Sequence, residues 1–476
     1  METTTPATRV ERDSMGEFEV PADAYFGANT MRAVVNFPIS GLRLPRGFIR
    51  AIGLIKQQAA VVNRELGLLD TRLCDAIVAA AQDVVDGTLD DQFPIDVFQT
   101  GSGTSTNMNA NEVISNRAIE LLGGEKGSRT PVHPNDHVNL CQSSNDVIPT
   151  AIHVAAATAI RQELLTALEV LEESLRRKSD QFWPVVKTGR THMQDATPIR
   201  LGQEFLGYAG QVERARRRLE AAATELEELA LGGTAVGTGV NSHPEFARRV
   251  IAKLSLATGL QFFETDNHFQ SQSTLDSVVA ASGVLRGAAV ALFEIAGNIR
   301  LLGCGPRAGF AEIAVPAVQP GSSIMPGKVN PVIAESVTMV AAQVIGNDAT
   351  IAFSGASGSL FELNVMLPVA AYNLLQSIAL LTSSAVNFAR KCVDGIEATD
   401  NGPALVERGL MICTGLVPRI GYDAAAAVAK EAYRSGRTVR EVARELTDLT
   451  EPDLDELLDP LKMTEPSLDS IGGATG

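Results

Sequence analysis

Apolar residues recur at helical spacing through the middle of the chain. A first stripe steps by three or four residues through Ile160, Leu164, Leu168, Leu171 and Leu175. A second runs from Leu275 to Leu302, and residues 203–229, 333–346 and 365–388 have the same character. Such steps keep one face of an α-helix apolar, so the pattern predicts five long helices. Without alternating strands, these helices favour an antiparallel bundle and an all-α fold.

The pattern changes on both sides of this region. Up to about residue 140, short helical stretches alternate with turns rich in proline, glycine and asparagine. Residues 428–446 are amphipathic and charged, and residues 447–461 are acidic. We therefore expect an N-terminal domain over residues 1–140, a central helical bundle over 141–395 and a small helical C-terminal domain over 396–476.

The composition is that of a large soluble protein. The 476 residues are 45% hydrophobic and 20% charged, with 40 basic and 56 acidic side chains and a formal charge of -16. This acidity argues against nucleic acid or an anionic membrane as a partner. Residues 1–20 contain no apolar core of a secretory signal. The uncharged span Leu363–Ala389 could cross a bilayer, but its many amides and hydroxyls favour a helix buried inside a bundle.

The five cysteines show no paired spacing, which is typical of a reduced cytoplasmic protein. The chain has no CxxC, no HExxH and no cluster of histidine with cysteine, so we expect neither zinc nor an iron–sulfur cluster. His133 and His137 are four residues apart and could hold a metal on one helix face, but Pro134 argues against a helix there. We expect no metal and no cofactor.

Residues 321–331 combine glycines, prolines, hydroxyls, a cation and an amide. Lys328 offers a point charge and Asn330 a two-way hydrogen-bonding group, which suits a carboxylate ligand. Ser322 and Ser323 become nucleophile or base candidates only if another group activates them. By composition alone, a well-ordered turn between helices is the more common explanation of such a segment.

Three segments together give a more specific picture. Residues 101–109 (GSGTSTNMN), 189–198 (GRTHMQDATP) and 321–331 (GSSIMPGKVNP) resemble, in order and spacing, the signature segments of the fumarase/aspartase superfamily. The resemblance extends over nearly the whole chain and is greatest to the metal-free class II fumarases. It implies a homotetramer with twenty bundled helices, active sites shared by three subunits, and no cofactor.

The resemblance also implies roles for individual residues. Ser322 corresponds to the catalytic base, Lys328 and Asn330 hold the substrate carboxylate at the reacting end, and His192 acts near the leaving group. The remaining substrate-binding residues are Ser102, Thr104, Ser143, Ser144, Asn145 and Thr191. Glu335 is expected to pair with His192. His133, Asn135 and Asp136 correspond to a secondary carboxylate site.

Structural explanations stand beside these roles. A serine hydroxyl such as that of Ser322 often caps a turn, and a single histidine such as His192 is more often structural than catalytic. The run Gln142–Asp146 has the composition of a helix start. That explanation is compatible with binding, because a helix N-terminus itself attracts anions. The identity of the general acid is open.

The expected function is the reversible hydration of fumarate to (S)-malate by trans addition through an aci-carboxylate intermediate. An aspartate ammonia-lyase on the same scaffold is the first alternative. Such enzymes tend to have Ser-Thr where this chain has Ser143-Ser144, which favours the hydratase. A catalytically silent helical assembly protein is the second alternative, and the intact signature residues count against it.

Overall fold

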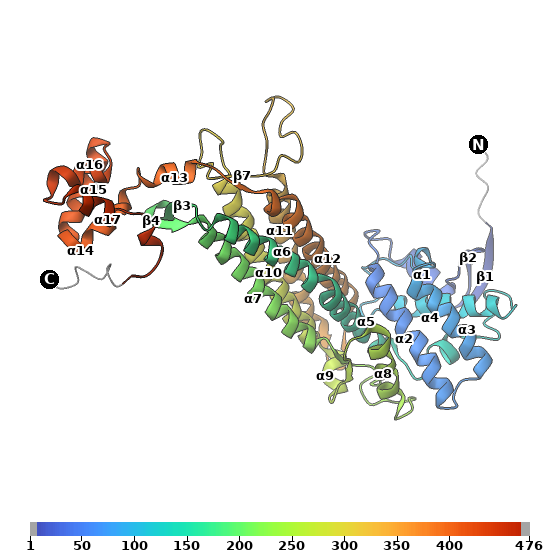
Figure 1. Ribbon diagram of the computed structural model, residues 1–476. Helices are drawn as coiled ribbons and strands as arrows, with labels where there is room; N and C mark the ends of the chain where they lie inside the picture. Colours follow the sequence, from blue (N-terminus) through green and yellow to red (C-terminus); the bar gives the residue numbers. More distant parts are fainter. Residues whose placement is uncertain (1–6, 468–476) are drawn as a thin grey trace. The chain divides into compact units, whose positions relative to one another are not determined.

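The computed structural model describes residues 7–467, and helices dominate it (Figure 1). The chain divides into two compact units, each made from three stretches of sequence. The first contains the described residues up to Thr166, together with Ala215–Ala289 and Ala341–Thr382. The second contains Ala167–Arg214, Val290–Val340 and the described residues from Ser383 onward. The expected domain boundaries after residues 140 and 395 stay predictions.

The first unit begins with an antiparallel hairpin of β1 (Thr8–Asp13) and β2 (Gly16–Pro21). Its helices are α1 (Ala28–Asn36), α2 (Arg46–Glu65), α3 (Thr71–Asp86), α4 (Thr104–Leu121), α5 (Ser144–Ala159), α8 (Phe246–Thr258) and α9 (His268–Ser273). Single turns lie at η1 (Asp90–Gln92), η2 (Pro134–Val138) and η3 (Ile160–Leu164). Short strand pairs join β5 (Glu228–Leu229) to β6 (Phe263–Glu264) and β8 (Ser359–Leu360) to β9 (Leu363–Asn364).

The second unit contains the hairpin of β3 (Val186–Thr191) and β4 (Gln194–Arg200), and the pair of β7 (Ile313–Ala314) and β10 (Glu397–Ala398). Its C-terminal part is built from η4 (Val393–Gly395), α13 (Asn401–Val406), η5 (Leu410–Leu416), α14 (Val417–Ile420), α15 (Tyr422–Ser435), α16 (Val439–Leu446), α17 (Glu451–Leu457) and η6 (Lys462–Thr464). Gly436, at φ 71°, separates α15 from α16, so the amphipathic stretch 428–446 forms two helices.

Five long helices contribute residues to both units. They are α6 (Leu165–Phe182), α7 (Leu201–Glu225), α10 (Asp276–Leu302), α11 (Val332–Gly358) and α12 (Leu367–Lys391). They confirm the five helices that the apolar stripes predict. The observed α11 is longer than the predicted 333–346, because Gly346 and Gly355 are accommodated inside it.

Side-chain contacts show which long helices are neighbours within each unit. In the second unit, the rings of Phe182 and Phe205 join α6 to α7 with centroids 5.2 Å apart, and Gln211 donates to Glu294 between α7 and α10. In the first unit, Ser282 of α10 donates to Asp348 of α11 at 2.7 Å. The long helices therefore pack as a bundle, and the mostly-α fold is confirmed.

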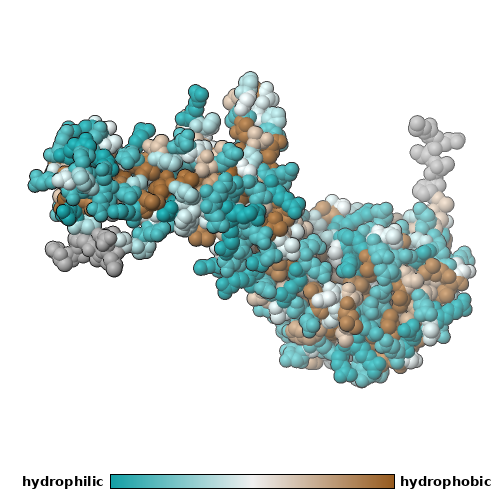
Figure 2. Space-filling model, in the orientation of Figure 1, coloured by the Kyte–Doolittle hydropathy of each residue, from teal (hydrophilic) through white to brown (hydrophobic). Residues whose placement is uncertain are grey.

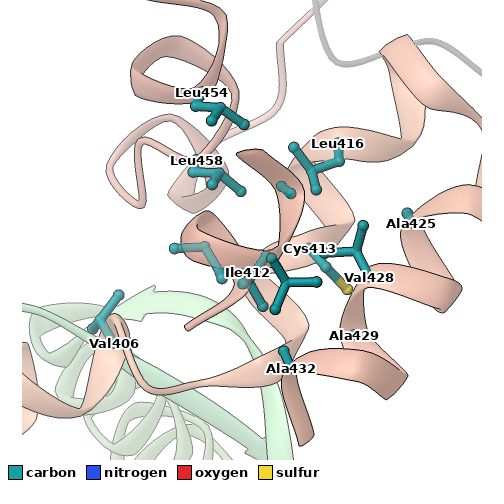
Figure 3. Close-up of a cluster of buried hydrophobic side chains, with 13 residues drawn as sticks. Val406, Ile412, Cys413, Leu416, Ala425, Val428, Ala429, Ala432, Leu454 and Leu458 are labelled. Atoms are coloured by element: carbon teal, nitrogen blue, oxygen red, sulfur yellow. The ribbon is translucent and has the colours of Figure 1, made fainter. Parts of the chain in front are cut away.

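The C-terminal helices surround a core of their own. Buried apolar side chains gather there from several short helices (Figure 3): Val406, Ile412, Cys413, Leu416, Ala425, Val428, Ala429, Ala432, Val439, Val442, Ala443, Leu454 and Leu458. Each helix is too short to be stable alone, because isolated helices of this length are marginal in water. This shared core holds the C-terminal part of the unit together.

Two long helices are unusually apolar. By length and composition, Asp276–Leu302 and Leu367–Gly395 could each cross a membrane, yet 44% and 50% of their most apolar windows are already buried within the single chain. Apolar residues also reach the surface among hydrophilic ones (Figure 2). On α10 and α11 these include Val290, Phe293, Met339 and Phe353, which are 49–67% exposed.

Candidate active site

The first two binding segments meet at the starts of two helices in the first unit. Thr104 is the first residue of α4 and Ser144 is the first residue of α5. Their hydroxyls lie 2.8 Å apart, and Ser102 Oγ lies 2.8 Å from Thr104 Oγ1. The N–H groups at a helix start carry partial positive charge and attract anions. Three predicted binding residues thus lie together where two helix N-termini converge.

Two glycines permit this close approach. Gly103 precedes α4 with φ 72°, a left-handed conformation that glycine adopts without strain. A Cβ atom on Gly103 would lie 2.9 Å from the side chain of Ile148 in α5. A Cβ on Gly101 would lie 1.8 Å from the carbonyl oxygen of Val365. The glycines of the first signature segment are therefore required by packing around the site.

The start of α5 is fixed by a capping box. Ser143 Oγ accepts from the N–H of Asn145, and Asp146 Oδ1 accepts from the N–H of Ser143 at 2.9 Å. Asp146 Oδ2 also accepts from the N–H groups of Gly232 and Thr234. Burial raises the pKa of the Asp146 carboxyl, and these N–H donors oppose that shift. The prediction that Gln142–Asp146 starts a helix is confirmed. Ser143 acts as the cap, and the hydroxyl of Ser144 contacts that of Thr104 instead.

The expected secondary site lies on η2, also in the first unit. His133 precedes this turn, and its Nδ1 accepts from the N–H groups of Asn135 and Asp136 at 3.2 Å. The expectation that Pro134 prevents a helix here is wrong. Proline occupies the first position of the turn, where its missing N–H costs nothing. No group of three or more His, Cys, Asp or Glu suited to a metal occurs among residues 7–467.

The loop after β7 in the second unit carries Ser322. Ser322 Oγ accepts from the backbone N–H groups of Ile324 and Met325, at 3.2 and 2.9 Å. The loop is closed by Asn330 Nδ2, which donates to the carbonyl of Gly321 at 2.6 Å. A Cβ on Gly321 would lie 2.3 Å from the Lys328 carbonyl oxygen. The hydroxyl therefore caps a tight turn, and it does so as an acceptor of two N–H groups.

His192 lies at the tip of the β3–β4 hairpin in the same unit. Thr191 pairs with Gln194, so His192 and Met193 form a two-residue turn. Both residues have positive φ, 55° and 60°. A two-residue turn with these angles matches the twist of the antiparallel strands that it joins, but positive φ is uncommon for residues other than glycine. His192 and Met193 are exposed. The hairpin therefore presents the histidine outward on a strained turn.

A buried ion network supports this hairpin. Lys187 of β3 and Glu312 are each 1% exposed, and their charged atoms lie 3.1 Å apart. Lys187 also contacts Glu204 at 2.8 Å, and Arg190 contacts Glu312 at 2.7 Å. The Arg190 guanidinium lies 4.3 Å from the centroid of the Phe310 ring. These contacts fix β3 immediately before Thr191 and His192.

The chain brings some predicted residues together and leaves others apart. Ser102, Thr104 and Ser144 form one hydrogen-bonded cluster, whereas the bonds around Ser322 stay within its own loop. Within residues 7–467, no hydrogen bond or ion pair joins Glu335 to His192, and their pairing stays a prediction. Glu335 lies in the first turn of α11, where its N–H donates to the Pro331 carbonyl.

Sequence reasoning missed the buried charges behind these segments. Glu312 stands in the apolar run Ala311-Glu312-Ile313-Ala314, and Lys56 stands on a helix face between apolar residues. A charge at a position that the pattern assigns to the core was the available signal, because such charges are rarely buried without a partner.

Comparisons with known proteins agree with this geometry. A family model described as Lyase matches residues 16–346, and one described as Fumarase C C-terminus matches residues 412–465. A class II fumarate hydratase of Bradyrhizobium diazoefficiens is 53% identical, covering 98% of both chains. One of Halobacterium salinarum is 56% identical, covering 96% of this chain and 97% of the relative.

A solved structure shows the same fold. The crystal structure of a class II fumarase from Schistosoma mansoni superposes with a TM-score of 0.94 at 40% identity, covering 97% of this chain and all of that one. The similarity in sequence and in structure extends over nearly the whole chain and includes all the segments described above. The chain belongs to the class II fumarate hydratase family.

Proposed function

We propose that this protein is a hydro-lyase that interconverts fumarate and (S)-malate without a cofactor. The observation that carries the proposal is its family membership over nearly the full chain. Two features support it: a hydroxyl cluster at two helix N-termini, and a serine that accepts two backbone N–H groups. The first suits a carboxylate and the second suits a base.

One substrate carboxylate binds at the converging starts of α4 and α5. Ser102, Thr104 and Ser144 supply hydroxyl donors, and the helix starts supply partial positive charge. Asn145 lies next to Ser144: its Nδ2 donates to the carbonyl of Ala235, and its Oδ1 accepts from Ser144 Oγ at 3.4 Å, so it supports the Ser144 hydroxyl beside the carboxylate. Ser143 fixes the helix start as its cap.

Ser322 removes the C3 proton of malate. A serine hydroxyl is a weak base unless its oxyanion is stabilised. The N–H groups of Ile324 and Met325 already point at Ser322 Oγ, and they stabilise negative charge there as they do in an oxyanion hole. Lys328 adds a positive charge from the same loop. The turn-capping explanation and the catalytic one therefore use the same two hydrogen bonds.

Proton removal puts charge on the neighbouring carboxylate, which becomes the dianionic aci-carboxylate. Lys328 and Asn330 hold this group. Asn330 uses one N–H to close the loop on Gly321 and keeps a second N–H, because a side-chain amide has two donors. The C2 hydroxyl then takes a proton and leaves as water. His192 and Thr191 act at this end, with His192 donating the proton directly or through a water molecule and Glu335 supporting His192.

We propose that the protein is a homotetramer whose sites take residues from three subunits. Phe293, Met339 and Phe353 on the long helices are each about half exposed or more in the single chain, which supports burial of these helices against other copies, because burying large apolar side chains is favourable. The most apolar parts of helices α10 and α12 are only about half buried in one chain. Packing against other copies in a tetramer would bury the rest. Residues Ser322 and His192 then come from different subunits.

Two further proposals concern binding and location. His133, Asn135 and Asp136 form a secondary carboxylate site, supported by the N–H groups that gather at the start of η2. The protein functions in the reducing cytoplasm, supported by the five cysteines Cys74, Cys141, Cys304, Cys392 and Cys413, all of which are free.

A parallel turnover assay tests the reaction. Purified protein with a chelator is given (S)-malate or L-aspartate, and the ultraviolet absorbance of fumarate is followed. Fumarate from malate alone supports the proposal. Fumarate from aspartate alone would reassign the protein as an ammonia-lyase on the same fold. Fumarate from neither substrate would favour a silent scaffold.

Hybrid tetramers test the shared site. Ser322→Ala and His192→Asn proteins are each inactive, but after unfolding and refolding together a random mixture should regain about a quarter of wild-type turnover, because a quarter of the sites combine two intact segments. Mixing Ser322→Ala with Lys328→Ala is the control. These residues share one loop, so no site is intact and no activity should return. Equal recovery in both mixtures would contradict a site built across subunits.

A further inference from the structure

Lys56 is a fully buried cation in α2 of the first unit. Its exposure is 0%, and its Nζ donates to Asn139 Oδ1 at 2.8 Å. Within residues 7–467 no carboxylate lies within ion-pair distance of this ammonium. Burial lowers the pKa of Lys56 to about 7, and the charge of Asp146 opposes that shift. A buried charge without an ion partner is costly, so its position calls for a functional explanation.

The ammonium lies within a group of buried amides. Asn139 Oδ1 accepts not only from Lys56 but also from the Nδ2 groups of Asn107 and Asn111, both at 3.2 Å. The side-chain oxygens of Asn107, Asn111 and Gln142 are buried without a hydrogen-bond partner. An ammonium has three donors and here uses one. The centre therefore holds positive charge and unused polar groups deep inside the unit.

This centre lies beneath both helix starts of the carboxylate cluster. Asn107 and Asn111 follow Thr104 by three and seven residues in α4, and residues at these spacings share one helix face. Asn139 Nδ2 donates to the carbonyl of Gln142 at 3.1 Å, directly before Ser143 caps α5. Buried polar residues thus connect Lys56 with the start of α4 at Thr104, through the helix face that carries Asn107 and Asn111. They also connect Lys56 with the start of α5, through the loop that precedes Ser143.

The cluster above contains no charged side chain of its own. Ser102, Thr104 and Ser144 are neutral, yet their proposed ligand is half of a dianion. We propose that Lys56 is a positioning residue that supplies positive potential to this carboxylate subsite and, through Asn139, aligns the starts of α4 and α5. The inference rests on the proposed fumarate hydration, and it adds a residue that the signature segments do not contain.

Other charged groups on the neighbouring elements are engaged elsewhere. Asp146 of α5 is the one whose charge acts on Lys56. Several other titratable groups on the elements packed against α2 have partners of their own: Glu112 with N–H groups of Gly27, Asn29 and Thr30, His137 with the N–H of His133, Cys74 with the carbonyl of Ala60, His153 with the carbonyl of Glu228, Lys253 with Glu65, Asp75 with Arg64, and Asp83 with Arg117. A pH effect at Lys56 is therefore coupled first to Asp146.

Steady-state kinetics of the full-length tetramer test the proposal. Replacing Lys56→Met should raise the KM for fumarate about ten- to a hundredfold while kcat changes less than about threefold, because the subsite loses charge but the chemistry keeps its groups. Wild-type kcat/KM should fall as pH rises above about 7, since the free enzyme then loses the ammonium proton. The variant should lack that fall. An unchanged KM, or a fall that persists in Lys56→Met, would overturn the proposal.

Lys178→Met is the matched control. Lys178 is another buried lysine, 8% exposed, whose Nζ donates to the carbonyl of Ile396. Its loss should reduce stability but leave the KM and the pH profile of kcat/KM at wild-type values. A KM increase in Lys178→Met equal to that in Lys56→Met would show a general packing effect and overturn the proposal.

If Lys56→Met does not fold, Asn111→Asp provides a second test of the role of Lys56. The change is isosteric and places a carboxylate at the residue that shares Asn139 Oδ1 with the ammonium. It should raise the KM and move the fall in kcat/KM to higher pH, because a nearby negative charge favours protonated lysine. Asn109→Asp, equally buried on the same helix but bonded to the Gln92 carbonyl, should do neither. A wild type that turns over neither fumarate nor malate refutes the proposed function, whereas an active wild type with unaltered variants refutes only the role of Lys56.

Discussion

The hydroxyls of Thr104 and Ser144 lie 2.8 Å apart, although the two residues are forty positions apart in sequence. Each is the first residue of its helix, so the contact brings two helix N-termini together. Gly103 permits the contact because its left-handed backbone and missing Cβ leave room for Ile148. The result is an anion site made of neutral donors.

Replacing Thr104→Val tests this site. Valine keeps the shape but removes the hydroxyl that bridges Ser102 and Ser144. Loss of one partner of a buried hydrogen bond costs about 1–3 kcal/mol, so the KM for fumarate should rise about five- to a hundredfold. Ser105→Ala, which removes a bond to Thr100 instead, is the control. An unaltered KM in the valine variant would exclude Thr104 from substrate binding.

Replacing Ser322→Ala tests the base. Turnover should fall by about two to four orders of magnitude, the usual contribution of a positioned base, while the tetramer and its melting temperature persist. The measurement is initial rate together with sedimentation velocity. Ser323→Ala should keep near-normal turnover because only Ser322 accepts the two N–H groups. Near-normal turnover in Ser322→Ala would refute its assignment as the base.

The long helices could be predicted from sequence because a strong physical signal specifies them. The stripe from Leu275 to Leu302 coincides with α10 almost residue for residue, since an apolar face must be buried along its whole length. The binding segments were also recognisable, because glycines such as Gly101 and Gly103 are required by packing.

The hairpin and the buried charges could not be predicted in the same way. The β3–β4 turn consists of His192 and Met193, which are not typical turn residues, and only the structure shows their positive φ. The partners of Glu312 and Lys56 are 83 to 125 residues away in sequence. Contacts over such separations depend on the packing of several elements, which a local pattern does not contain.

Replacing Glu312→Gln tests the support of the hairpin. Lys187 and Arg190 would lose their shared carboxylate in a buried setting. Removing one partner of a buried pair costs about 3–5 kcal/mol, so the thermal midpoint should fall by several degrees and turnover should fall with it. Glu431→Gln breaks an exposed pair with Arg434 and should change neither. A wild-type midpoint in Glu312→Gln would show that the network is not structural.

Because His153 is buried, we expect the free energy of unfolding to depend on pH. Its ring is buried in α5, its Nδ1 lies 2.7 Å from the Glu228 carbonyl oxygen, and burial lowers its pKa. The unfolded chain therefore binds a proton more readily than the folded one as pH falls below about 6.5. The stabilisation by neutral His153 is complete above that pH and is lost as pH falls toward the folded pKa. One such group changes the free energy of unfolding by up to about 1.4 kcal/mol per pH unit.

Chemical unfolding at closely spaced pH values measures this slope. His153→Gln should be less stable than wild type at neutral pH but should lose less stability between about pH 6.5 and pH 5, because its side chain does not titrate. His137, whose pKa burial also lowers, should leave a residual slope, and His137→Gln combined with His153→Gln should remove most of it. A slope equal to that of wild type in the double variant would show that carboxyl groups, and not buried histidines, control acid stability in this range.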